Sequence, residues 1–364
     1  ARRRPTAPPP PSPRPGPPTP ATLAADLKAA TAGSVLRLEP GAYRGVRIGA
    51  LGKSLILAAS DPENPPRFTG GAILTGASDL TFRSVVFDIP EAAADFATAL
   101  TINGGARLAF EACGFQGRVM PETRWGKGLT ALNVEGLTIR KCWARDLYVG
   151  MAVATSGKVE ITDNDLSDLG SDGIDFAGCL GLLIARNRII GFHPVTGYHP
   201  DGIQGMQPGA SRGSQDVVIE DNLIRGNAQG MQVIAENKVR MARVAIRRNV
   251  ILDCGYNGIM AAQIDGVDVA GNVLLLARDG LPDKSWVRVE DCTSASATDN
   301  RAMGFIGQAT QAGNVAIPKA TPEQLEAAVA GWVAIHRPSD EIARLTAELS
   351  VAKDRLAQIK ALAE

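Results

Sequence analysis

The sequence has few aromatic residues, no excess of charge of either sign and no long apolar run. Aromatic residues make up 5% of the 364 positions, and 38 basic side chains balance 38 acidic ones. A neutral chain has no overall field to attract nucleic acid or an acidic polymer. No run is long enough to span a membrane, and no apolar signal-peptide segment is visible. We therefore expect neither a nucleic-acid partner nor insertion into a membrane.

Cysteine and histidine are also scarce. The five cysteines are an odd number, which favours buried free thiols over a disulfide framework. The three histidines show no zinc spacing, and the sequence has neither a nucleotide-binding glycine loop nor a nucleophile elbow. Nucleotide-dependent and serine-based enzymes are therefore set aside.

What the sequence does contain is a ladder of asparagines. Two residues separate each of them from a short apolar alternation such as Val159-Glu160-Ile161, and the frame extends upstream to Cys142, Cys113 and Val85. A unit of about 22 to 29 residues, repeated about nine times, is typical of a solenoid, and the period-two alternation indicates strands. The ladder consists of Asn164, Asn187, Asn222, Asn249, Asn272 and Asn300.

A second repeated pattern places a glycine before an apolar residue once in each unit. The apolar residue is predicted to point inward from another strand, and the glycine to mark a tight corner or a close backbone approach. Two strand registers per coil, separated by turns, predict a parallel β-helix. The pattern reads Gly150-Met151, Asp172-Gly173-Ile174, Asp201-Gly202-Ile203, Gln229-Gly230-Met231 and Asn257-Gly258-Ile259.

The start of the repeats carries a more specific pattern. A short amphipathic helix over 22–30 is followed over 33–43 by Gly-Ser-Val-Leu-Arg-Leu-Glu-Pro-Gly-Ala-Tyr. This segment resembles the lead-in of right-handed β-helix proteins of the pectin-lyase-like superfamily, in which the helix covers the open end of the solenoid. The resemblance implies an all-β solenoid, a right-handed parallel β-helix with an N-terminal helical cap and a helical C-terminus.

Three regions follow from these patterns. Residues 1–20 are rich in proline and arginine and predict an extended, disordered tail. Residues 21–312 are assigned to the β-helix and its cap helix, and residues 313–364 to C-terminal helices. The last of these has a heptad pattern that predicts a coiled-coil oligomerisation stem, and a helix folded back over the last coil is the alternative.

A candidate site lies where the repeat is longest. The interval from Asn187 to Asn222 exceeds a typical coil by about ten residues, and insertions of this kind often line a binding face. Stacking of successive coils should gather polar side chains from this loop and its neighbours. We predict catalytic roles for Asp172, Asp201 and His199, and substrate-binding roles for Asp175, Tyr198, Gln204, Gln229 and Gln232.

The chemistry rests on the two aspartates that share one position in successive coils. Carboxylates about 5 Å apart repel, so one of them should hold a proton near neutral pH. An acid paired with a base is what glycosidic cleavage requires. The structural alternative is that Asp172 and Asp201 each cap a β-turn.

The segment Ser171-Asp172-Gly173-Ile174-Asp175 adds a second resemblance. It is similar to the Asn-Thr-Asp-Gly-Ile-Asp segment of the polygalacturonase family, which implies that Asp172 matches the catalytic aspartate and that Asp201 stands in for the aspartate of the next coil. The later Gly-His-Gly and Arg-Ile-Lys motifs of that family are missing. The architecture also resembles β-helix depolymerases and tailspikes of bacterial viruses.

We therefore expect an extracellular or virion-associated protein that hydrolyses polysaccharide. Two alternatives stay open: a lyase acting by β-elimination on uronic acids, and a non-catalytic glycan-binding spike or adhesin. No metal ligands are assigned, although calcium stays open as a cofactor because Asp163, Asp165 and Asp168 form a short acidic run. The expected partners are a polysaccharide and further copies of the chain, with a trimer as the expected oligomer.

Overall fold

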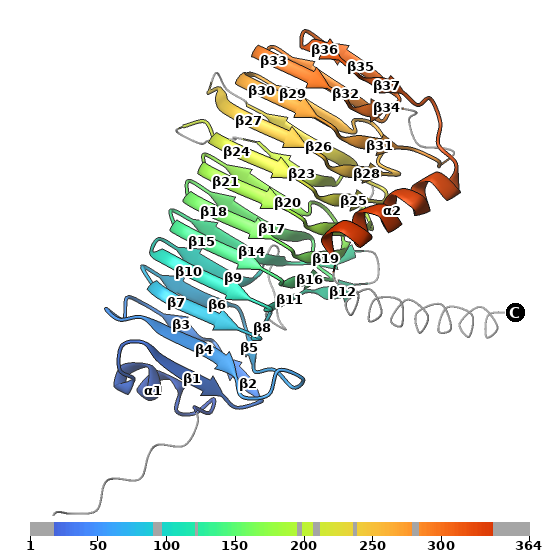
Figure 1. Cartoon of the computed structure of the whole chain (residues 1–364). Helices are drawn as coiled ribbons and strands as arrows, with labels where there is room; N and C mark the ends of the chain where they lie inside the picture. The colour runs from blue at the N-terminus through green and yellow to red at the C-terminus, as the bar shows by residue number, and fades with distance from the viewer. Residues whose placement is uncertain are drawn as a thin grey trace, which may run out of the picture.

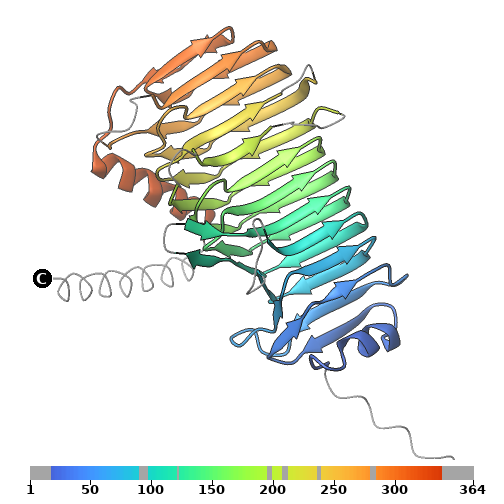
Figure 2. The same cartoon turned by 180° about the vertical axis from the view of Figure 1, so that it is seen from behind.

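The computed structural model describes residues 18–89, 97–120, 123–194, 199–206, 212–235, 239–278 and 284–337. Here the chain winds into a stack of coils whose walls are three parallel sheets, A, B and C (Figures 1 and 2). Successive coils add one strand to each sheet, so strands that neighbour in a sheet are a full coil apart in the sequence. The predicted parallel β-helix is confirmed.

Sheets A and B each have 12 strands. Sheet A contains β1 (Ser34–Leu38), β4 (Leu55–Ala59), β7 (Ser78–Arg83), β10 (Ala106–Glu111), β15 (Glu135–Arg140), β18 (Gly157–Thr162), β21 (Leu180–Ala185), β24 (Gln215–Glu220), β27 (Met241–Arg247), β30 (Ile264–Ala270), β33 (Thr293–Thr298) and β36 (Thr310–Ala312). Sheet B contains β2 (Ala42–Arg44), β5 (Arg67–Thr69), β8 (Val86–Asp88), β11 (Gly114–Gln116), β16 (Trp143–Arg145), β19 (Asp165–Leu169), β22 (Arg188–Phe192), β25 (Leu223–Arg225), β28 (Val250–Leu252), β31 (Val273–Leu275), β34 (Arg301–Ala302) and β37 (Val315–Ala316).

Sheet C has 11 strands and carries the candidate site. Its strands are β3 (Arg47–Ile48), β6 (Ala72–Thr75), β9 (Thr98–Asn103), β14 (Lys127–Leu132), β17 (Val149–Ala154), β20 (Ile174–Ala177), β23 (Asp201–Gly205), β26 (Gln229–Ile234), β29 (Ile259–Ala262), β32 (Trp286–Glu290) and β35 (Gly304–Gly307). A separate antiparallel hairpin joins β12 (Arg118–Met120) to β13 (Thr123–Trp125).

Each coil has three strands, not the two that the sequence suggested. Most strands of sheet B are three residues long and present a single core side chain, such as Phe68 of β5 or Ile251 of β28. So short a segment shows no alternation in the sequence. The stack also starts at β1, upstream of the first predicted unit, so sheet A has 12 strands where about nine units were expected.

The asparagine ladder forms as predicted. The side-chain Nδ2 of Asn187 donates to Asn222 Oδ1 at 3.0 Å and to the Ile161 carbonyl at 2.8 Å. Asn222 Oδ1 also accepts the backbone N–H of Asn187 at 2.9 Å. All six side chains are fully buried, and Asn314 adds a further rung. Cys142 continues the ladder upstream, where its N–H donates to Asn164 Oδ1 at 2.8 Å.

The glycine ladder marks a close backbone approach in sheet C. A Cβ placed on Gly173 would lie 2.4 Å from the carbonyl oxygen of Gly202, and one on Gly202 would lie 2.6 Å from that of Gly230. Gly128, Gly150 and Gly230 are crowded in the same way by the glycine of the following coil. Any side chain here would push successive coils apart, which explains why glycine recurs.

Helices close the solenoid at its N-terminal end and cover one side. Helix α1 (Leu23–Ala29) buries Leu23 and Leu27 in the core, in agreement with the predicted cap (Figure 1). Helix α2 (Pro322–His336) begins with a capping box at Thr321. The β-helix continues to Ala316, past the predicted boundary at residue 312. Neither helix of the described part has the length and apolar character of a membrane span.

Helix α2 folds back over the outer face of sheet B (Figures 1 and 2). Its Leu325 and Trp332 pack on the outward-facing Leu223, Leu252 and Leu275 of β25, β28 and β31. The fold-back alternative was raised for the last helix of the chain, over the last coil, so the packing of α2 does not test it. The tail over 1–17 and the predicted stem over 339–364 lie outside the described residues.

Candidate active site

The predicted polar residues meet at sheet C, on or just before β20, β23 and β26. The register pairs Asp175 with Gln204 and Gln204 with Gln232, so these three follow one another along one row of the sheet. A second row lies at the strand starts, where Asp201 pairs with Gln229. Asp172 occupies the equivalent position two residues before Ile174, as Asp201 does before Ile203. The repeat alone therefore brings seven of the eight predicted residues to neighbouring coils, with Tyr198 outside the described residues.

Asp172 links its own coil to the next. Its Oδ1 accepts the backbone N–H of Asp201 at 2.7 Å, and its Oδ2 accepts the Ser171 hydroxyl at 3.2 Å. Burial raises the pKa of Asp172, while these two hydrogen bonds and the nearby His199 and Lys127 counteract the increase. Hydrogen bonds to a carboxylate favour its charged form, so Asp172 is the member of the group best supported as an anion.

Asp201 is enclosed by the protein. Its side chain is fully buried, and its Oδ2 accepts the Gln204 amide at 2.6 Å. Its Oδ1 has no hydrogen-bond partner among the described residues. Burial, with the charge of Asp172 adding to it, raises the pKa of Asp201 to about 7. This carboxyl can store or relay a proton, but it has no surface with which to touch a polymer.

Asp175 is the acid that reaches the surface. Its side chain is partly exposed and lines a shallow groove of about 170 Å³ across β14, β17, β20 and β23, together with Thr130, Phe176, Gln204 and Met206. Burial of the carboxyl raises the pKa of Asp175 well above its usual range, and the charges of Asp172 and Asp201 raise it further. A carboxylic acid that keeps its proton at neutral pH can act as a general acid.

The remaining predicted residues fall into two groups. Gln229 and Gln232 are buried and bond to each other, and Gln229 Oε1 also accepts from Asn257 at 3.4 Å. These two amides continue the two rows onto β26. His199 is exposed beside the acids, and its charge favours ionised Asp172.

Two residues near the site were not predicted. Lys127 starts β14 and counteracts the raised pKa of both Asp172 and Asp175. Its place before Gly128 follows the glycine pattern, so the sequence did contain a signal for it. Tyr256 is 58% exposed and adopts φ +73°, a backbone region that bulky residues rarely occupy. It directly precedes Asn257, and no periodic signal marks it.

The acidic run Asp163, Asp165 and Asp168, considered above as a possible calcium site, forms ion pairs with side chains of the next coil. Asp163 binds Arg186 at 2.8 Å, and Asp165 binds Arg188 at 3.0 Å. Asp168 lies 3.1 Å from His193. Within the described ranges, no group of three or more His, Cys, Asp or Glu side chains is arranged to hold a metal ion. We assign the run a structural role.

Comparison with known proteins supports the same architecture. A family described as a right-handed β-helix region matches residues 98–274. No curated protein matches the sequence. The structure is similar to the Dettilon tailspike protein, with 14% identity, a TM-score of 0.59 and coverage of 82% of this chain. The chain spans 61% of the length of that tailspike.

Two further structures are similar. The surface protein and adhesin PfbA of Streptococcus pneumoniae gives 13% identity and a TM-score of 0.53, over 81% of this chain and 92% of the adhesin. A mutant of the periplasmic alginate epimerase AlgG gives 15% identity and a TM-score of 0.52, over 77% and 67%. At these identities the similarity establishes the fold. The chain has a right-handed parallel β-helix fold.

Proposed function

We propose that this β-helix acts on a polysaccharide and hydrolyses its glycosidic bonds at the outer face of sheet C. The observation that carries the proposal is the cluster of three carboxyl groups, Asp172, Asp175 and Asp201, on successive coils beside a surface groove. Their surroundings differ, since hydrogen bonds to Asp172 favour its charged form against the effect of burial, whereas burial and the neighbouring carboxylates raise the pKa of Asp175. Carboxyl groups whose pKa values are pushed apart are the requirement for acid and base roles in glycoside hydrolysis.

The roles follow from access and protonation. Asp175 faces the groove and donates its proton to the oxygen of the scissile bond as that bond breaks. Water attacks the anomeric carbon, and Asp172 takes the proton that the water loses. Asp201 positions Asp172 through its backbone N–H and holds Gln204 through its side chain. This differs from the sequence-based assignment, in which Asp172 and Asp201 formed the acid and base pair and Asp175 only bound substrate.

The wider setting agrees with an extended substrate. Parallel coils present a long flank on which a polymer can lie across several strands. Tailspike, surface-adhesin and periplasmic proteins share the fold, which supports action outside the cytoplasm or on a virion. Assembly into a homo-oligomer, with the trimer as the expected form, is part of the same proposal.

Incubation with acidic and neutral capsular glycans tests the activity. Hydrolysis predicts new reducing ends without the ultraviolet absorbance of an unsaturated sugar, whereas that absorbance would indicate a lyase. Asp175→Asn and Asp172→Asn should each lower kcat by about 10²–10⁴-fold, the usual contribution of a general acid or base. Asp216→Asn, at an exposed position of β24 in sheet A, is the matched control and should cut at the wild-type rate. Unchanged cleavage by both site variants would refute the assignment.

Binding without cleavage is the second candidate. The enclosure of Asp201 and the shallow groove favour it, because a cleavage site commonly surrounds the scissile bond more closely. A protein that binds a glycan and yields neither reducing ends nor unsaturated products would establish this alternative.

A further inference from the structure

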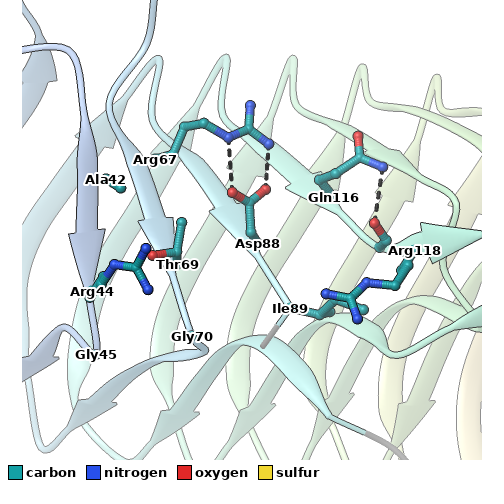
Figure 3. A pocket seen from close by; sticks show the side chains of 11 residues that line it. Ala42, Arg44, Gly45, Arg67, Thr69, Gly70, Asp88, Ile89, Gln116 and Arg118 are labelled. Carbon is teal, nitrogen blue, oxygen red and sulfur yellow. Dashed lines mark hydrogen bonds and ion pairs between the residues drawn. The ribbon is translucent and has the colours of Figure 1, made fainter. Parts of the chain in front are cut away.

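A second pocket lies on the outer face of sheet B, near the N-terminal end of the stack (Figure 3). It has a volume of about 390 Å³ and is formed by β2, β5, β8 and β11 with the start of β12. It therefore belongs to a different sheet and to earlier coils than the acidic cluster on β20 and β23. Its size is in the range of small-ligand sites.

The charged lining of this pocket is dominated by arginine. Arg44, Arg67 and Arg118 line it together with one carboxylate, Asp88. Arg67 forms a two-pronged pair with Asp88, in which Nε donates at 2.9 Å and Nη2 at 2.6 Å. Figure 3 shows this pair at the upper side of the pocket, with Arg44 and Arg118 at opposite sides below it. The single carboxylate of the lining is thus already matched by Arg67, so it does not neutralise the charge of Arg44.

Two polar groups of the lining lack partners within the described part of the chain. The exposed Arg44 makes no hydrogen bond or ion pair with any described residue, so its planar guanidinium is available to a ligand. The buried hydroxyl oxygen of Thr69, which lines the same pocket, also has no hydrogen-bond partner there. Buried polar groups are rarely left unpaired in a folded protein.

Glycines keep the pocket open. Gly45 follows β2 and Gly70 follows β5, both with positive φ, and both line the pocket. A Cβ on Gly45 would meet nothing within 4 Å, so a side chain there would project into free space. The turns of two successive coils thus leave a hollow beside Arg44.

We propose that this pocket binds an acidic sugar unit through its carboxylate. A guanidinium presents a planar pair of donors that matches a carboxylate. The adjacent Arg67–Asp88 pair places donors and acceptors side by side, which suits the hydroxyl groups of the same sugar. The site is separate from the acidic cluster, and the inference holds whether or not the protein cleaves its glycan.

The test measures binding of a galacturonic acid trimer to the full chain by titration calorimetry. The methyl-esterified trimer is the matched probe, because it keeps the sugar and removes the charge. We expect the acid to bind, the ester to bind much more weakly, and Arg44→Gln to weaken acid binding at least about tenfold, as for loss of one charged hydrogen-bonded contact. Arg47→Gln, an exposed arginine of the same coil on sheet C, should bind like wild type.

Several outcomes would overturn the inference. If the acid and the ester bind equally well, or if wild type and Arg44→Gln bind the acid equally well, the pocket does not recognise the carboxylate. Binding of inorganic sulfate without binding of the trimer would indicate a simple anion site. Loss of binding in Asp175→Asn but not in Arg44→Gln would place the acidic sugar in the sheet C groove instead. The proposed hydrolysis is scored separately by reducing ends, so either proposal can fail alone.

Discussion

The backbone N–H of Asp201 donates to Oδ1 of Asp172 at 2.7 Å, and this contact ties two successive coils together beside the candidate site. An aspartate that caps an ordinary turn accepts instead from a backbone N–H of its own turn, two residues further on. Such a cap also needs no further acids around it. Here Asp201 Oδ1 and Asp175 Oδ1 are buried without a described partner, which costs folding free energy. Perturbed, unsatisfied acids beside a groove favour a functional origin.

The first prediction concerns pH and stability. Since the folded-state pKa of Asp201 is raised to about 7 from its ordinary 3.8, the folded protein binds this proton more tightly than the unfolded chain does. The stability that this proton contributes to the fold is fully present below about pH 4 and is lost as the pH rises through 7. The loss is roughly 4 kcal/mol at most. Asp201→Asn keeps the neutral form and should be more stable than wild type at pH 8, as measured by urea unfolding.

The control for this prediction is Asp216, whose pKa is shifted in the opposite direction. Arg243 lowers the pKa of the exposed Asp216, so its pairing stabilises the fold at neutral pH and is lost in acid. Asp216→Asn should therefore lose a little stability at neutral pH and none in acid. Identical pH profiles for wild type and Asp201→Asn would contradict the raised pKa.

The second prediction concerns the glycine ladder. In Gly202→Ala the new methyl group would lie 2.5 Å from Ile224 Cγ2 and 2.6 Å from the Gly230 carbonyl oxygen. We expect a loss of about 2–4 kcal/mol, or a chain that does not fold. Gly331→Ala in α2 meets nothing within 4 Å and should gain up to about 1 kcal/mol. Thermal melts of both variants decide it, and equal melting temperatures would disprove the close approach.

The third prediction concerns the asparagine ladder. Asn222→Leu removes the acceptor for the Asn187 N–H and Nδ2, and should cost about 1–3 kcal/mol for each group left unpaired. Asn314→Leu lies at the half-buried end of the ladder, where water can replace the lost bonds, so its cost should be smaller. Chemical denaturation compares the two. A larger loss at Asn314 would mean that the ladder does not stabilise the interior.

The fourth prediction concerns helix α2. Trp332 is 3% exposed, and its indole N–H donates to the Asp221 carbonyl at 2.7 Å. Trp332→Ala should weaken docking of the helix by about 3–5 kcal/mol and expose it to protease, while circular dichroism of the β-helix stays unchanged. Ile335→Ala, at a position 77% exposed, should be cleaved no faster than wild type. Unfolding of the whole chain in Trp332→Ala would show that the helix is part of the core.

The sequence by itself determined the repeat and its register. Asn222 and Gly202 recur at fixed places because each coil must satisfy the same buried backbone groups and allow the same close approach. These requirements are the same in every coil, so the residues that meet them recur at a regular interval in the sequence. The same register brought Asp172, Asp175 and Asp201 to neighbouring coils, since a solenoid stacks equivalent positions. The short strands of sheet B, with one core residue each, left no trace of this kind.

Only the tertiary structure decided which acids face solvent. Asp201 is enclosed and Asp175 lines a groove, although both lie in similar Asp-containing segments, because exposure depends on how coils above and below cover each side chain. It also placed α2 on Leu252, and gathered Arg44 and Arg67 around one hollow. These arrangements come from contacts between residues far apart in sequence or from gaps left by turns. Neither the long-range contacts nor the gaps recur at a regular interval, so no periodic pattern in the sequence indicates them.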